Sequence, residues 1–264
     1  MCPGDPVLRD TAGVDIAQLT RKILDRRTAP DGPLPIVQAG HPALRRRTLS
    51  AEGRLDASLL RELVEAMTIT MREAPGVGLA APQIGLPLRL YVVEDRFAPE
   101  DEPQDEPGGE PEDQAGSEDA SVLHDPLERR PVPLRVFLDP QVELLGQQHV
   151  YAWEGCLSVD GWQSIVCRSR RVRLRATELL ADDTLQAIDE EFVGWPARIV
   201  QHETDHLAGT LCHDRAVPRS FVDAGYTSLY AEMPEAVQRL GLEGEITQLA
   251  PGQVLVERSP GETR

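Results

Sequence analysis

The sequence is short of lysine, asparagine and aromatic residues. Lys22 is the only lysine and asparagine is absent, so the basic side chains are almost all arginine. Aromatic residues make up 4% of the chain, and we therefore expect a core of aliphatic side chains. A run of about 18 apolar residues, which a membrane-spanning helix needs, is also missing. Residues 1–10 lack the basic-then-apolar pattern of a secretory signal, so we expect a cytoplasmic protein without membrane contact.

Cysteine is scarce and irregularly spaced. The four cysteines are Cys2, Cys156, Cys167 and Cys212. Thiols of a protein that is not exported normally stay reduced. We therefore expect free thiols or metal ligands rather than disulfides.

The net charge of −17 argues against a protein that binds DNA through its phosphates. Much of this charge lies in residues 97–120, which hold ten acidic residues and no lysine or arginine. Without them the net charge is about −7, an ordinary value for a small domain. The segment has too few apolar residues to pack, and we predict a disordered acidic insertion at 98–130.

A length of 264 residues fits one domain with extensions. We expect an N-terminal extension at 1–34, a compact domain at 35–217 and a C-terminal tail at 218–264. Apolar spacing predicts a helix from Asp56 to Met71, capped by Asp56, and another from Trp195 to Ala208, ended by Gly209. The pattern also predicts a short helix at Asp15–Arg27 and strands at Leu88–Val93, Pro133–Leu138, Val142–Leu145, Val172–Ala176 and Leu185–Phe192.

The second of these helices contains the pattern His-Glu-x-x-His, at His202, Glu203 and His206. Residues four apart lie on one face of a helix, so both imidazoles can reach the same metal ion. Glu203 is next to the first histidine and can reach a water at that ion without becoming a ligand. The pattern predicts a hydrolytic metal site, because its position on a well-defined helix that follows a strand disfavours the alternative of two surface histidines with chance acidic neighbours.

A catalytic site of this kind needs a third ligand. A metzincin protease would place a histidine where Cys212 stands, and His213 is one residue late. A thermolysin-like protease would use a downstream glutamate, and Glu232, Glu235, Glu243 and Glu245 are available. The upstream segment Glu154-Gly155-Cys156-Leu157-Ser158 offers a thiolate instead, which with two imidazoles leaves one tetrahedral position open. Taken alone, Cys156 fits a buried apolar position better than a metal ligand.

A third segment, Gly76 to Gly85, is rich in glycine and alanine, which let another backbone or a ligand come close. Its Gln83 has an amide that can donate to an oxyanion. The segment lacks the Lys-Ser/Thr of a phosphate-binding loop, so nucleotide binding is not expected.

Together the three segments resemble the motifs of the peptide deformylases, in the order of that family: Gly76–Gln83, Glu154–Ser158 and Gln201–Leu207. The similarity extends from about Ile36 to Arg215 and makes 35–217 the catalytic domain. It implies an α+β fold with mixed sheets around a central helix that carries the two histidines. It also implies a hydrolase that removes the formyl group from formylmethionine at the start of new polypeptides and releases formate.

The resemblance implies these residue roles as well. Cys156, His202 and His206 would bind the metal, and Glu203 would act as general base and then as acid. Gln83 and the backbone N–H of Leu157 would hold the oxyanion. Glu154 would pair with Arg168. The substrate would contact Gly78, Gly155, Val77, Trp195 and Ile199.

The expected metal is Fe²⁺, and Zn²⁺, Ni²⁺ or Co²⁺ would also suit these donors. The expected partners are a formylmethionyl peptide and, transiently, the ribosome, and the protein is expected to be a monomer. The sequence departs from the family pattern at Ser158-Val159-Asp160, where Ser-x-Pro is frequent, at Gln163, where many members have an arginine, and at Asp139-Pro140, where Asn-Pro is common.

Two other readings remain open. A zinc endopeptidase would take its third ligand downstream of the helix and leave Cys156 unused. A non-catalytic relative would use the acidic insertion as an interaction module, although all the proposed catalytic positions are present.

Overall fold

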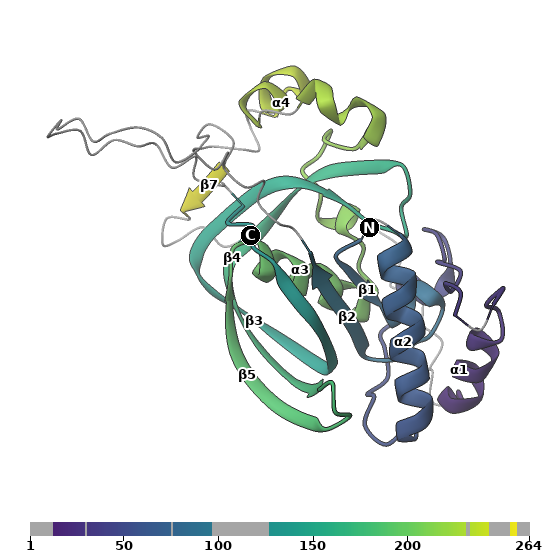
Figure 1. Cartoon of the computed structure of the whole chain (residues 1–264). Helices are drawn as coiled ribbons and strands as arrows, with labels where there is room; N and C mark the ends of the chain where they lie inside the picture. Colours follow the sequence, from purple (N-terminus) through teal and green to yellow (C-terminus); the bar gives the residue numbers. More distant parts are fainter. Residues whose placement is uncertain are drawn as a thin grey trace, which may run out of the picture.

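The computed structural model describes residues 13–29, 31–74, 76–96, 127–230, 233–242 and 254–257 (Figure 1). Its main feature is an antiparallel sheet with the strand order β1-β2-β3-β4-β5, to which β6 is added at β4 and β7 at β3. The strands are β1 (Gly78–Ala80), β2 (Leu90–Asp95), β3 (Val132–Gly155), β4 (Trp162–Leu179), β5 (Leu185–Val193), β6 (Val222–Asp223) and β7 (Val254–Glu257).

The α-helices are α1 (Ile16–Leu24), α2 (Ala57–Glu73), α3 (Trp195–Leu207) and α4 (Met233–Leu240). Short 3-10 helices are η1 (Pro42–Arg45), η2 (Ala81–Ile84), η3 (Cys212–Arg215) and η4 (Ala224–Tyr230). Asp56 caps α2 as predicted, and Asp15 caps α1 in the same way, because each carboxylate accepts a backbone N–H bond of 2.9 Å in the first turn. Within the described ranges, every helix is too short or too polar to cross a membrane.

Helix α3 lies in the middle of the molecule, between the long curved strands β3 to β5 and the short pair β1 and β2 (Figure 1). It begins after Gly194, whose φ of 65° suits glycine, and it ends before Gly209, whose φ is 78°. A Cβ at Gly209 would lie 2.8 Å from the carbonyl carbon of Arg45, so glycine also lets the η1 segment pack against the helix end. The predicted α+β fold with a central histidine-bearing helix is confirmed.

The strands β3 and β4 are longer than predicted. Pro133–Leu138 and Val142–Leu145 were expected to be separate strands, but both belong to β3. The register shifts after Leu138 and after Leu145, and Asp139 and Gly146 adopt positive φ there. These irregularities interrupt the alternation of side chains, so the pattern indicated two strands where one bent strand exists. The predicted strand at Val172–Ala176 is likewise only the centre of β4.

Asp139 also explains one departure from the family pattern. Its carboxylate accepts bonds from the Ser50 hydroxyl and from the backbone N–H groups of Ala51 and Glu52. The bend in β3 is thereby fastened to the segment that leads into α2.

The main core extends over both faces of the inner strands. One cluster joins α1 and α2 to one face of β1, β2 and β3, and it includes Ile16, Ile23 and Leu63. A second cluster packs α3 against the other face and includes Tyr91, Phe137 and Val200. The segment expected to be an N-terminal extension therefore contributes α1 to the main core.

Most of the predicted acidic insertion at 98–130, namely residues 98–126, lies outside the described residues. At its end Glu128 forms an ion pair of 2.6 Å with Arg170. The basic run on β4 is also paired: Arg171, Arg173 and Arg175 share one exposed face with carboxylates of Glu191, Asp189 and Glu143. That face presents matched charges rather than a basic patch.

Candidate active site

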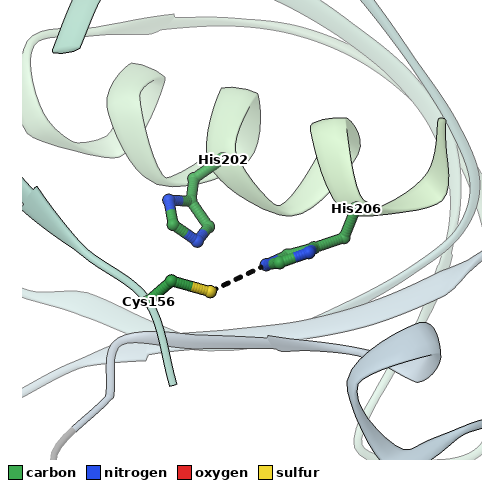
Figure 2. A group of neighbouring side chains, drawn as sticks. All are labelled: Cys156, His202 and His206. Atoms are coloured by element: carbon green, nitrogen blue, oxygen red, sulfur yellow. Dashed lines mark hydrogen bonds between the residues drawn. The ribbon is translucent and has the colours of Figure 1, made fainter. Parts of the chain in front are cut away.

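Three side chains from distant parts of the chain converge on one point. His202 and His206 lie one turn apart on α3, and Cys156 follows directly after β3 (Figure 2). The Cys156 Sγ atom is 3.4 Å from Nε2 of His206, and one donor atom of each residue lies within 4.8 Å of the others. A thiolate and two imidazoles at these separations fit a single divalent transition-metal ion.

Cys212, the position of the third ligand in a metzincin, is not part of this group. The Cys212 thiol, together with His202, outweighs burial and lowers the pKa of Cys156 to about 5. Cys212 forms a second group of potential donors with Glu154 and His202. The Glu154 carboxylate is already paired with Arg168, so this second group is not a separate metal site. Its Glu154 instead orients His202, a member of the first group.

The downstream glutamates do not supply a ligand within the described residues. Glu235 lies on α4, is half exposed and pairs with Arg239. The other three, Glu232, Glu243 and Glu245, lie outside the described ranges.

His202 is oriented by a buried carboxylate. Its Nδ1 is 2.7 Å from Oε1 of Glu154, which leaves Nε2 to face the Cys156 sulfur. The predicted pair of Glu154 and Arg168 is confirmed, with Arg168 Nη2 donating to Glu154 Oε1 over 2.6 Å. Burial raises the pKa of Glu154, but the charges of Arg168 and Arg198 outweigh it and hold that pKa well below its usual range.

Three members of this charge network were missed from the sequence. Arg198 is buried, with Nε 3.4 Å from Glu154 and its other nitrogens donating to backbone carbonyls. Asp205 receives bonds from Arg168 and from Arg215. One signal in the sequence could have indicated these residues. Arg198 and Asp205 fall on the histidine-bearing side of the helix, and charged residues on a side that packs against apolar surroundings need partners, because unpaired buried charges are costly.

Glu203 lies beside the three donors and is buried, with 4% of its surface exposed. Its Oε2 atom has no hydrogen-bond partner among the described residues, and neither has Nδ1 of His206. Burial raises the pKa of Glu203 and, together with the nearby His202 charge, lowers the pKa of His206 to about 4. Gly78 on β1 makes room for the carboxylate, because a Cβ there would lie 2.2 Å from Glu203 Oε1.

The amide of Gln83 points at the same site. Its Oε1 accepts a bond of 2.8 Å from the backbone N–H of Ala80, which turns Nε2 toward the sulfur of Cys156 at 3.7 Å. Next to Cys156, the side chain of Leu157 packs over Gly76, where a Cβ would lie 2.7 Å from Leu157 Cδ1. The backbone N–H of Ser158 donates to the Cys156 sulfur over 3.4 Å.

The expected substrate-contacting residues surround these groups. Val77, Trp195 and Ile199 belong to one apolar cluster. The Trp195 ring is held by a bond of 2.7 Å from Nε1 to Asp95. Gly155 is exposed and pairs with Gln163 across β3 and β4.

Comparison with known proteins gives a consistent result. The family model described as polypeptide deformylase matches residues 33–221. Peptide deformylase 3 of Streptomyces avermitilis is 46% identical over 209 residues, which are 78% of this chain and 83% of the relative. Peptide deformylase 1 of Streptomyces coelicolor is 42% identical over 233 residues, which are 87% and 94% of the two chains.

Solved structures agree with this result. A peptide deformylase from Acinetobacter baumannii, determined with Met-Ala-Ser bound, has a TM-score of 0.54 and 28% identity over 70% of this chain and 99% of the other. The enzyme from Thermotoga maritima has a TM-score of 0.50 and 27% identity over 70% and 97%. These matches decide against the zinc endopeptidase and the non-catalytic relative. The chain belongs to the peptide deformylase family and is an enzyme that removes the formyl group from the N-terminus of newly made polypeptides.

Proposed function

We propose that Cys156, His202 and His206 hold one Fe²⁺ ion and that Glu203 is the general base and acid of deformylation. The observation that carries this proposal is the convergence of the three donor atoms, within 4.8 Å of one another, beside a buried carboxylate with an unpaired oxygen. When bound, a divalent ion in such a site supplies Lewis-acid chemistry: it polarises the formyl carbonyl and lowers the pKa of the attacking water so that Glu203 can deprotonate it.

Glu203 moves the proton in this scheme. Its Oε2, the oxygen without a partner among the described residues, takes a proton from the attacking water and later gives it to the departing amine. A carboxylate serves this double role best when its pKa is above the ordinary value, and burial raises the pKa of Glu203 in that direction.

Gln83 and Leu157 hold the oxygen that becomes negative. The Ala80 N–H fixes the Gln83 amide so that Nε2 donates into the site. Leu157 directly follows Cys156, so its backbone N–H lies at the same edge. Donors that are already in place cost no reorganisation when charge develops.

The substrate enters between two glycine positions. Gly78 and Gly155 line the path of the extended peptide, and Val77, Trp195 and Ile199 provide an apolar wall for the methionine side chain. The structure from Acinetobacter baumannii was determined with Met-Ala-Ser, which has the composition of a deformylation product. We assign the same class of peptide to this chain.

The proposal also includes the identity of the metal, the contact with the ribosome and the location in the cell. Fe²⁺ is chosen over Zn²⁺, Ni²⁺ and Co²⁺ on family resemblance, since all four suit this donor set. The enzyme acts as a monomer in the cytoplasm and meets the ribosome transiently, because formylated N-termini arise where chains are made. The matched charges on β4 do not supply a basic face for that contact.

The decisive experiment replaces Glu203 by alanine and measures formate release from formyl-Met-Ala-Ser in anaerobically purified protein. We expect bound metal to be retained and turnover to fall by about 10²–10⁴-fold. Glu65→Ala, on the exposed face of α2, is the matched control and should be neutral. Near-normal turnover of the Glu203 variant would refute its role. Cys156→Ala should lower metal content, and unchanged occupancy would return Cys156 to a packing role.

A further inference from the structure

Two aromatic rings stack on the surface beside the candidate metal centre. Trp162, the first residue of β4, and Phe221, just before β6, lie face to face, with ring centroids 4.6 Å apart and an angle of 1° between the planes. The two residues remain 41% and 48% exposed. Single exposed apolar side chains are common, but two adjoining rings left open to solvent indicate a binding surface.

The surrounding structure holds both rings in place. Trp162 is paired with Asp223 where β6 joins β4. The edge of the His213 ring meets Phe221 with centroids 4.7 Å apart and an angle of 88°, and Nδ1 of His213 is 2.7 Å from the Ser164 hydroxyl. The rings are therefore positioned before a ligand arrives, so binding to them requires little ordering of side chains.

The pair of rings adjoins the proposed substrate path. Gly155, the last residue of β3, pairs with Gln163, and a Cβ at Gly155 would lie 3.8 Å from the carbonyl oxygen of Trp162. The residues next to this pair on the two strands are Cys156, the proposed metal ligand, and Trp162. A peptide that extends from the metal centre past Gly155 therefore runs beside the backbone that carries Trp162.

The rings are distinct from the proposed wall for methionine. The apolar cluster that contains Val77, Trp195 and Ile199 does not include Trp162 or Phe221. An extended peptide rises about 3.3 Å per residue, so positions two to four of a substrate cover about 10 Å beyond the formylmethionine. Because Trp162 adjoins the substrate path, a side chain at one of these positions can reach the rings.

We propose that Trp162 and Phe221 form an aromatic platform, which binds a substrate side chain at one of positions two to four and favours an aromatic residue there. The inference rests on the proposed function, in which the substrate passes Gly155. It deepens that function by assigning a sequence preference downstream of the formylmethionine.

The preference for an aromatic side chain follows from the chemistry of the rings. A third ring can stack on an exposed face or meet an edge of the pair, and it removes apolar surface of both molecules from water. Alanine at the same substrate position is too small to cover the rings. Binding energy from a side chain remote from the formyl group acts mainly by holding the substrate, which lowers KM.

The test measures kcat/KM of the full-length enzyme on four formylated tetrapeptides. The parent is formyl-Met-Ala-Ala-Ala, and the other three carry phenylalanine at position two, three or four. The variants are Trp162→Ala, Phe221→Ala, Trp162→Phe and, as matched control, Leu185→Ala. Leu185 is 58% exposed and pairs with Leu179, at the end of β4 that lies farthest along the strand from Trp162.

In the wild type we expect phenylalanine at one position to raise kcat/KM about fivefold over the parent peptide, through a lower KM. Trp162→Ala and Phe221→Ala should reduce this ratio to about one, because each removes half of the platform. Trp162→Phe keeps a ring and should retain most of the preference, and Leu185→Ala should match the wild type. The ratio is taken within each enzyme, so a general loss of activity in a variant cancels.

Two kinetic outcomes would overturn the proposal. One is a wild-type enzyme with equal kcat/KM on all four peptides, and the other is a preference for phenylalanine that both alanine variants retain. Sedimentation at the assay concentration accompanies the kinetics. A wild-type dimer that Trp162→Ala dissociates, together with equal rates on the four peptides, would assign the rings to contact with a second copy of the chain.

These outcomes are separate from failure of the proposed catalytic roles. The ratio between two peptides does not depend on which residue moves the proton, because the chemical step is the same for both. A preference that needs Trp162 and Phe221, in an enzyme whose Glu203→Ala variant stays fully active, would refute the general base and leave the aromatic platform standing.

Discussion

Glu203 on the central helix lies against the backbone of Gly78 on β1. A Cβ at Gly78 would be 2.2 Å from Glu203 Oε1, 2.6 Å from Cδ and 2.8 Å from Cγ. The Glu203 side chain can take this position only because residue 78 is a glycine, which has a hydrogen atom where other residues have a Cβ. The glycine-rich segment and the histidine motif, more than a hundred residues apart in the sequence, are matched in shape.

Replacement of Gly78 by alanine should displace the Glu203 carboxylate. A shift of about 1 Å in a catalytic group can cost about 100-fold in rate, and we expect kcat/KM on formyl-Met-Ala-Ser to fall by that amount. Bound metal should be unchanged, because Gly78 does not touch the three donors. Gly13→Ala is the control, since a Cβ there would meet nothing within 4 Å. An active Gly78→Ala enzyme would show that Glu203 has another position from which it can work.

Glu154→Gln should weaken the metal site without changing any ligand. The neutral amide removes the charge that balances Arg168 and Arg198, and it weakens the bond that orients His202. Loss of such a supporting carboxylate typically costs about 10–100-fold in metal affinity, which competition with a chromophoric chelator measures. The metal-free protein should also lose about 3 kcal/mol of unfolding free energy in urea, because buried arginines are left uncompensated.

The control for this change is Glu191→Gln. Glu191 pairs with Arg171 on the exposed face of β4 and β5, where both side chains are about half exposed. An exposed pair contributes about 0–1 kcal/mol. Equal losses in the two variants would mean that burial of the Glu154 network has no energetic consequence.

The sequence predicted helices α1, α2 and α3 far better than the long strands. Helix α2 follows from apolar spacing and the Asp56 cap, which are local signals. Strand β3 does not, because Pro140 and Gly146 indicate turns locally and are tolerated only where register shifts interrupt the pairing with β4. The continuity of the strand depends on its neighbours rather than on its own residues.

The same distinction holds at the candidate metal centre. Cys156, His202 and His206 belong to short motifs whose residue types indicate metal binding directly. The contribution of Arg198 and the effect of Cys212 on the pKa of Cys156 arise only when distant segments pack together. An arginine in an apolar helix and a cysteine after it carry no local sign of their partners.

Acidification should destabilise the protein partly through Glu94. The Arg72 hydrogen bond lowers the pKa of Glu94 below its ordinary value in the folded state, against the opposing effect of burial. A group whose pKa is lower in the folded state stabilises the fold above its unfolded pKa, and this contribution disappears as the pH falls through the folded pKa. Arg72→Ala should therefore lower the Tm at pH 7 and flatten the decline of Tm from about pH 5 downward. Arg54→Ala, whose side chain donates to the Ser50 carbonyl, should keep the wild-type slope.

Removal of the metal should lower the Tm of the wild type and leave one variant unaffected. An ion that binds only the folded state stabilises it by about 2.7 kcal/mol when its free concentration is 100 times the Kd. Chelation should therefore shift the wild-type Tm downward, whereas Cys156→Ala, which lacks one of the three donors, should show little shift. Cys167→Ala keeps the donor set and should behave as the wild type does. Because this comparison measures unfolding rather than turnover, it separates loss of the ion from loss of Glu203 chemistry. A full chelator-dependent shift in Cys156→Ala would mean that the ion is held by a set of side chains that excludes this cysteine.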